Sequence, residues 1–249
     1  MRRDVIPGVL GEPCPGGSSS HREAIRRRRL VTVVAIDGPA GAGKSTVARA
    51  VAGALGYVYL DTGAMYRALA LTALEEGVDL HDDERLESLA SSLDIDARAG
   101  RTLLNSVDVT DAIRAPEVSR AASEVSRHAG VRRVMVAKQR EVGKESDVVM
   151  EGRDIGATVA PESPAKIYLT ASLEERSLRR LGQRGGGNGE QLARMKESLS
   201  ARDRADALRA ESPLVRADGA HVIDSTGKKA DEIVAEIVAV VKAALDASR

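Results

Sequence analysis

Residues 38–45 have the types and spacing of a phosphate-binding loop. They read G-P-A-G-A-G-K-S and match G-x-x-x-x-G-K-[S/T] at every fixed position. The glycines let the backbone approach an anion closely, and the loop N–H groups, with the start of the next helix, form an anion site. Lys44 would then reach the β- and γ-phosphates of a nucleotide, and Ser45 would hold Mg²⁺.

The segments on either side of this loop support the same interpretation. An apolar run over residues 30–36 predicts a strand, and the pattern over Lys44–Leu55 predicts a helix. A strand followed by the loop and a helix is the context in which the motif binds phosphate. The alternative is a glycine-rich turn with an incidental lysine, and such a turn does not need a strand before it and a helix after it.

Charge balance and composition argue against several classes of partner. Lys+Arg and Asp+Glu number 37 each and the pI is 6.9, so no basic excess favours nucleic acid or an acidic membrane surface. Four Tyr with neither Phe nor Trp argue against stacking on bases. A single cysteine, Cys14, excludes an internal disulfide and fits a reducing compartment. We therefore expect a cytoplasmic protein without nucleic-acid or membrane partners.

Residues 1–29 look like an addition to the folded part. They combine Gly, Pro and Ser over residues 11–20 with a basic cluster over 26–29, and they lack the apolar stretch of a secretory signal. We favour a disordered basic tail, or a start codon assigned too early, over a basic arm that binds nucleic acid.

Five short apolar runs alternate with helical patterns, which predicts an α/β fold with a parallel sheet of about five strands and helices on both faces. The predicted strands cover residues 30–36, 57–60, 147–150, 166–169 and 221–223. The predicted helices cover 44–55, 63–74, 86–93, 118–142 with a break near Gly130, a stretch from Ser172, 190–207 and 230–247. A small hairpin is predicted for 102–109 with the segment 94–97.

Residues 78–145 are too long for a single crossover between strands, so we expect an inserted subdomain there. The chain would then be one domain over residues 30–249, with its core in 30–77 and 146–249. A glycine-rich segment within about 180–190 predicts a short lid.

Five arginines stand at predicted strand ends and helix starts: Arg67, Arg153, Arg180, Arg202 and Arg209. Ligands of open parallel sheets bind at the carboxyl ends of the strands, so these side chains are expected to converge there. Such a group suits phosphoryl transfer, which needs positioning and neutralisation of spread negative charge. Each arginine taken alone could equally be a solvated surface charge.

Motifs of other phosphate-loop proteins are missing from the sequence. It contains neither the guanine signature N-K-x-D nor the transporter signature L-S-G-G-Q. The D-x-x-G at residues 224–227 lies too late in the chain for a GTPase switch. These absences argue against a GTPase switch and against a transporter.

Several longer motifs carry a resemblance to a known family. They occupy residues 36–46, 60–67, 121–126, 131–132, 151–156, 202–203, 206, 209, 212–214 and 224–226, in unbroken order over about residues 31–245. The most diagnostic read D-T-G-A-M-Y-R and E-G-R-D-I-G. In these motifs the sequence resembles the bacterial cytidylate kinases of the nucleoside monophosphate kinase family.

The resemblance implies an NMP-binding role for the inserted subdomain and a role for each matched residue. The donor ATP would lie on Gly38, Pro39, Ala40, Gly41, Ala42, Gly43, Lys44, Ser45 and Thr46, with Mg²⁺ on Ser45 and, through water, on Asp37. The acceptor CMP would contact Thr62, Arg67, Ser123, Arg132, Arg153, Asp154, Arg202, Asp206 and Arg209. Lys44, Arg153, Arg180 and Arg202 would form the catalytic set.

Within that acceptor set, the resemblance assigns Ser123, Arg132 and Asp154 to cytosine. The chemistry agrees, because cytosine presents an amino donor beside two acceptors, which a carboxylate and a guanidinium complement. Uracil would place a carbonyl against the carboxylate and leave buried groups unpaired. The alternative for Asp154 is a cap at a strand end or a ligand of Mg²⁺-bound water.

We therefore expect a monomeric enzyme of pyrimidine nucleotide metabolism that transfers a phosphoryl group from ATP to CMP or dCMP. Two alternatives remain open. One is another nucleotide or small-molecule kinase on the same fold, for example one acting on UMP. The other is a nucleotide-binding regulatory protein.

Overall fold

A five-stranded parallel sheet forms the centre of the fold in the computed structural model, which describes residues 31–183, 185–209 and 213–247. Its strands are β1 (Val33–Asp37), β2 (Val58–Asp61), β6 (Val148–Gly152), β7 (Ala165–Thr170) and β8 (His221–Asp224). They lie in the order β2-β6-β1-β7-β8, with every neighbouring pair parallel. The predicted fold class is confirmed.

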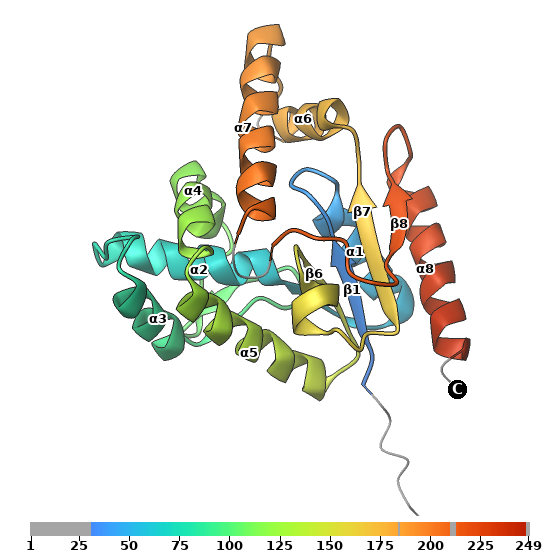
Figure 1. Ribbon diagram of the computed structural model, residues 1–249, viewed down its shortest axis with the longest axis horizontal. Helices are drawn as coiled ribbons and strands as arrows, with labels where there is room; N and C mark the ends of the chain where they lie inside the picture. Colours follow the sequence, from blue (N-terminus) through green and yellow to red (C-terminus); the bar gives the residue numbers. More distant parts are fainter. Residues whose placement is uncertain (1–30, 184, 210–212, 248–249) are drawn as a thin grey trace, which may run out of the picture. The chain divides into compact units, whose positions relative to one another are not determined.

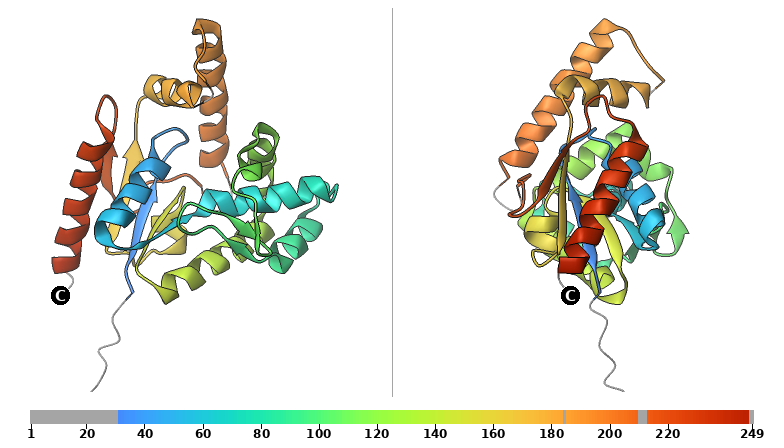
Figure 2. Two further views of the ribbon diagram at one scale, coloured as in Figure 1. Left: turned by 180° about the vertical axis from the view of Figure 1, so that it is seen from behind. Right: turned by 90° about the vertical axis from the view of Figure 1, so that its right-hand side faces the viewer.

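Helices cover both faces of this sheet, as Figures 1 and 2 show. Side chains of β1 alternate between the faces, because successive residues of a strand point to opposite sides. Val34 and Ile36 pack with α1 (Lys44–Leu55) and α8 (Ala230–Ala247). Ala35 packs on the other side, together with α2 (Thr62–Glu75) and α5 (Ala129–Glu145).

Residues 78–145 form a helical insert with a small sheet of its own. It contains α3 (Asp83–Ser92), α4 (Pro116–Val125), the 3-10 turn η1 (Ala112–Arg114) and, at its end, α5. The predicted hairpin is an antiparallel sheet of β3 (Ile95–Asp96), β4 (Leu103–Leu104) and β5 (Val107–Asp108). Apolar side chains of the insert share one continuous core with the large sheet. Within it, α4 packs against α2, and α3 packs against α5 and α2.

Two further helices, α6 (Leu173–Gly182) and α7 (Gly189–Ala207), follow β7 and pack against each other. Ser172 caps α6, and Asn188 with Gln191 forms a capping box at the start of α7. Met195 and Leu199 of α7 form a small apolar cluster with Ala40 of the phosphate loop. The helix pair is therefore attached directly to that loop.

The turn after β6 was not predicted. Residues Ile155–Val159 form one short π-helix, which follows Asp154 immediately. The expectation for residues 1–29 lies outside the described residues. Among the described residues, no helix is both long and apolar enough to cross a membrane.

Candidate active site

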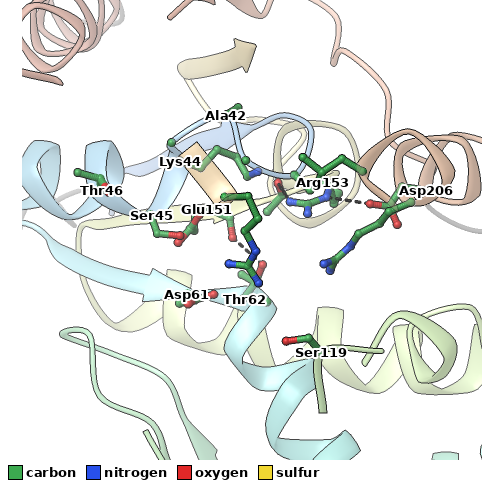
Figure 3. A pocket seen from close by; sticks show the side chains of 18 of the residues that line it. Ala42, Lys44, Ser45, Thr46, Asp61, Thr62, Ser119, Glu151, Arg153 and Asp206 are labelled. Atoms are coloured by element: carbon green, nitrogen blue, oxygen red, sulfur yellow. Dashed lines mark hydrogen bonds and ion pairs between the residues drawn. The ribbon is translucent and has the colours of Figure 1, made fainter. Parts of the chain in front are cut away.

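A cavity of about 550 Å³ opens where the parallel strands end. The residues expected to bind ligand that line it are Ala40, Gly41, Ala42, Gly43, Lys44, Ser45, Thr46, Thr62, Arg67, Arg132, Arg153, Asp154, Arg180, Arg202, Asp206 and Arg209. Only Asp37, Gly38, Pro39 and Ser123 of the expected set are not part of the lining that the described residues form. Residues far apart in the sequence thus converge on one site (Figure 3).

The phosphate loop has the backbone shape that its glycines were expected to permit. Gly41 and Gly43 have positive φ angles of 79° and 92°. Lys44, only 6% exposed, folds back over the loop and donates from Nζ to the carbonyls of Gly38 and Pro39, both at 2.8 Å. Burial lowers the pKa of Lys44, and the nearby Arg153 lowers it further. A bound polyphosphate would favour the charged form.

Glu151, at the end of β6, is a site residue that sequence reasoning missed. Its carboxylate lies beside Lys44 and hydrogen-bonds Ser45, and it accepts from the Tyr59 hydroxyl at 2.5 Å. Burial raises the pKa of Glu151, and Asp61 raises it further. The signal was present in the sequence, because Glu151 opens the motif E-G-R-D after a buried strand.

Thr62 lines the cavity at the start of α2, directly after β2. Its hydroxyl donates to the backbone carbonyl of Glu151 at 2.6 Å, as drawn in Figure 3. This bond joins the ends of two neighbouring strands, β2 and β6, so Thr62 also holds these strand ends together beside the cavity.

Arg132 and Asp154 meet across the cavity although 22 residues separate them. The Nη2 of Arg132, on α5, donates to Oδ2 of Asp154 at 2.6 Å, and both side chains are less than 9% exposed. The Arg132 guanidinium also lies over the ring of Tyr66, 5.6 Å from its centre. The structure therefore brings together two of the three residues expected to face a base.

Ser123, the third of these residues, lies on α4 but not on the cavity lining. Its hydroxyl donates to the carbonyl of Ser119 at 3.3 Å, one turn earlier in the same helix. Ser119 and Ser126 line the cavity instead, and Figure 3 shows Ser119 beside it. The hydroxyl of Ser126 donates to the carbonyl of Ser123 at 3.0 Å.

Acidic side chains hold several arginines of the cavity in place. Asp206 on α7 accepts from Nε of Arg153 at 3.0 Å and lies 3.2 Å from Nη2 of Arg209. Burial opposes ionisation of Asp206, but Arg153 and Arg209 outweigh it and lower the pKa of the carboxyl. Arg67 is paired in the same way with Asp61, at 2.8 Å.

These pairs leave donor capacity for a ligand. The buried Nε atoms of Arg67, Arg132 and Arg202 have no hydrogen-bond partner in the described part of the chain. Burial, with the nearby Arg153, lowers the pKa of Arg202 to about 10. Buried donors of this kind are normally satisfied, so their position around the cavity indicates an anionic, oxygen-rich ligand.

Asp37 lies at the end of β1 and is not part of the cavity lining that the described residues form. Its two carboxylate oxygens accept from the backbone N–H groups of Ile155 and Gly156, each at 2.8 Å. The side chain is 3% exposed, and burial raises its pKa to about 6 although the backbone hydrogen bonds oppose this. Asp37 thus bridges β1 to the turn after Asp154, and its expected role in positioning Mg²⁺ through water stays a prediction.

The oxygen atoms that could hold Mg²⁺ are those of Ser45, Asp61 and Glu151, which line the cavity. No group of three or more His, Cys, Asp and Glu in the described residues forms a metal cage. Mg²⁺ at nucleotide sites is bound by one or two protein oxygens together with substrate phosphates and water. The residues present fit that pattern.

A phosphate loop after the first strand of a parallel sheet, facing a cavity lined with arginines, defines a phosphate-loop phosphotransferase. The family model described as cytidylate kinase matches residues 34–243 of the chain. The chain belongs to the cytidylate kinase family, as its motifs predicted.

Individual relatives match over most of their length. The cytidylate kinase of Solibacter usitatus is 49% identical over 217 residues, which cover 84% of this chain and 92% of the relative. The cytidylate kinase of Desulforamulus reducens is 49% identical over 209 residues, covering 82% and 94%. That of Bacillus cereus (strain B4264) is 44% identical over 213 residues, covering 84% and 95%.

Proposed function

We propose that this protein transfers the γ-phosphoryl group of ATP to CMP or dCMP, forming CDP or dCDP. The observation that carries the proposal is the buried Arg132–Asp154 pair, which lies on the same cavity as the phosphate loop. A guanidinium and a carboxylate side by side complement the acceptors and the amino group of cytosine. The family relationship supports the same acceptor.

On the donor side, the phosphate loop and Lys44 would bind the phosphates of ATP. Mg²⁺, when bound with the nucleotide, neutralises charge on the transferring group, and Ser45 with Glu151 or Asp61 would hold it. Arg153 and Arg202 would neutralise the charge shared by donor and acceptor phosphates.

On the acceptor side, Arg67, Arg153 and Arg209 would hold the phosphate of CMP, and Arg202 with Asp206 the sugar hydroxyls. The segment 78–145 would serve as the nucleotide-binding insert. No general base is needed, because the second pKa of a phosphate monoester is about 6 and the attacking oxygen is already ionised at neutral pH.

The single cysteine and the balanced charge support action in the cytoplasm on free nucleotides. The proposed enzyme acts as a monomer, because one chain by itself brings the phosphate loop and the expected acceptor residues onto a single cavity.

A panel of nucleoside monophosphates tests the proposal. ADP release is measured with ATP and Mg²⁺ in the presence of CMP, dCMP, UMP or AMP. CMP and dCMP are expected to give the highest kcat/KM. Preference for UMP or AMP would favour another kinase on the same fold, and nucleotide binding without turnover would favour a regulatory protein.

Arg180→Ala is expected to lower kcat by about ten- to a hundredfold while changing CMP affinity less than about twofold. Arg180 lies near the end of α6, where its Nη1 donates to Gln183 at 3.0 Å, and both residues line the cavity. We propose that it contacts the transferring phosphoryl group only when the lid segment closes. Steady-state kinetics and calorimetric CMP binding measure the two effects.

Arg194→Ala serves as the control, because Arg194 is 75% exposed on α7 and pairs with Glu190. Equal losses of CMP affinity and turnover in Arg180→Ala would contradict a role limited to the closed state.

A further inference from the structure

Helices α6 and α7 hold the phosphate loop, and Ala40 is contacted by both of them. Figure 1 labels the two helices. The methyl group of Ala40 packs against Met195 and Leu199 of α7. Its carbonyl accepts from Nη1 of Arg176, on α6, at 3.1 Å. Its N–H donates to Oδ1 of Asp203, on α7, at 3.4 Å. Every part of this one residue is thus contacted by the helix pair.

The buried Arg176 forms an ion pair with the partly buried Asp203 behind the loop. Nη1 of Arg176 donates to Oδ2 of Asp203 at 2.5 Å, and the two side chains are 9% and 20% exposed. Nε of Arg176 donates to the carbonyl of Ala171 at 3.0 Å, which fixes the guanidinium at its other end. Arg176 is absent from the cavity lining formed by the described residues, so it does not contact a ligand there.

The carbonyl that Arg176 holds determines the direction of the next N–H group. A trans peptide is planar, so its C=O and the following N–H point in opposite directions. With the Ala40 carbonyl directed at Arg176, the N–H of Gly41 is directed away from it. Gly41 itself lines the cavity.

The same arrangement repeats one helical turn later. Nη1 of Arg179 donates to the carbonyl of Ala42 at 3.3 Å, which turns the N–H of Gly43 away from α6. Two alternate peptides of the loop are therefore oriented by two arginines three residues apart on one helix.

Helix α6 lies so close to the loop that it also restricts the loop's sequence. A Cβ atom at Gly41 would lie 2.9 Å from the backbone oxygen of Arg176 and 3.1 Å from its Cβ. No side chain fits between the helix and the loop at that position. The contact is thus made by the backbone of α6 and not only by the long side chain of Arg176.

We propose that Arg176, fixed by Asp203, is a positioning residue of the donor site. By holding the Ala40 carbonyl it keeps the N–H of Gly41 in the orientation that binds a donor phosphate. The ion pair acts on ATP through the loop backbone and does not act on the acceptor nucleotide. This inference rests on the proposed assignment of ATP to the phosphate loop.

The test compares the affinities for the two nucleotides in Arg176→Lys and Asp203→Asn. A lysine keeps the charge but cannot bond Ala40, Ala171 and Asp203 together, because it lacks the fork of the guanidinium. Arg176→Lys is expected to raise the Kd of ATP with Mg²⁺ about tenfold or more, since a charge-assisted bond that orients a donor is lost. Asp203→Asn is expected to change it in the same direction by less. The Kd of CMP, measured separately by calorimetry, is expected to stay within about twofold in both.

Glu174→Gln is the matched control. Glu174 on α6 pairs with Lys196 on α7 at 3.1 Å and so joins the same two helices without reaching the loop. It is expected to leave both affinities unchanged. If Arg176 had a purely structural role, its replacement would either leave both affinities unchanged or lower both together, following the loss of thermal stability.

The proposal fails if folded Arg176→Lys binds ATP within twofold of wild type, or loses CMP affinity to the same degree. If Arg176→Lys does not fold, Asp203→Asn decides by the same criterion, and failure of both to fold would point to a structural role. Binding of ATP is measured without an acceptor, so a wild-type preference for another monophosphate would overturn the proposed acceptor and leave this inference standing.

Discussion

Lys44→Ala is expected to lower kcat by about a hundred- to a thousandfold while CMP affinity changes less than about twofold. Lys44 is buried at the base of the phosphate loop, where its ammonium bonds two loop carbonyls and lies beside Glu151. Donor phosphates would draw this charge to the transferring group, so its loss removes stabilisation of the transition state. Rapid-quench turnover and equilibrium CMP binding separate the two effects.

Lys144→Ala provides the control, because Lys144 is 68% exposed and pairs only with Glu141 among the described residues. Lys44→Met is made in parallel to keep the volume of the side chain, and thermal melting of each variant identifies losses due to unfolding. Wild-type turnover in a folded Lys44 variant would contradict the assignment of the donor phosphates to this loop.

Asp154→Asn is expected to lower kcat/KM for CMP by about ten- to a hundredfold and to lower that for UMP much less. In the structure, Asp154 holds Arg132 by a buried charge-assisted bond of 2.6 Å. The amide replaces one acceptor oxygen with a donor, which suits the O4 carbonyl of uracil and not the amino group of cytosine. Steady-state kinetics with both nucleotides give the ratio directly.

Asp111→Asn controls for the loss of a carboxylate elsewhere in the insert, since the Asp111 side chain is 97% exposed. An unchanged CMP/UMP ratio in Asp154→Asn would leave Asp154 as a strand-end cap or a ligand of Mg²⁺-bound water.

The elements of the fold were predictable because local signals coincide with their ends. The helix predicted over Lys44–Leu55 has these bounds in the structure, with Gly56 in the left-handed conformation at its end. The break near Gly130 is also present, between α4 and α5. Apolar periodicity and capping residues act over a few positions, so the sequence alone displays them.

Partners of buried side chains could not be predicted in the same way. Asp37 bonds the backbone 118 and 119 residues further along the chain, and the sequence around Ile155 and Gly156 does not indicate that this carboxylate is their partner. Ser119 and Ser123 differ by one helical turn, and only the packing of α4 decides which hydroxyl lines the cavity. Arg176 looks like one of several arginines on α6 until its contact with Ala40 is seen.

The insert shares its apolar core with the large sheet, and this limits how it could be exchanged between proteins. Side chains of α3, α4 and α5 pack into the same cluster as Ala35, Val148 and Met150 of the sheet. The helix α2 lies between them, since both α3 and α4 contact it. Grafting residues 78–145 onto another kinase scaffold would therefore expose an apolar face unless the matching residues of α2 and the sheet were transferred with it. A chimaera designed to change acceptor choice must accordingly include this part of the protein interior and cannot be joined only at the two ends of the insert.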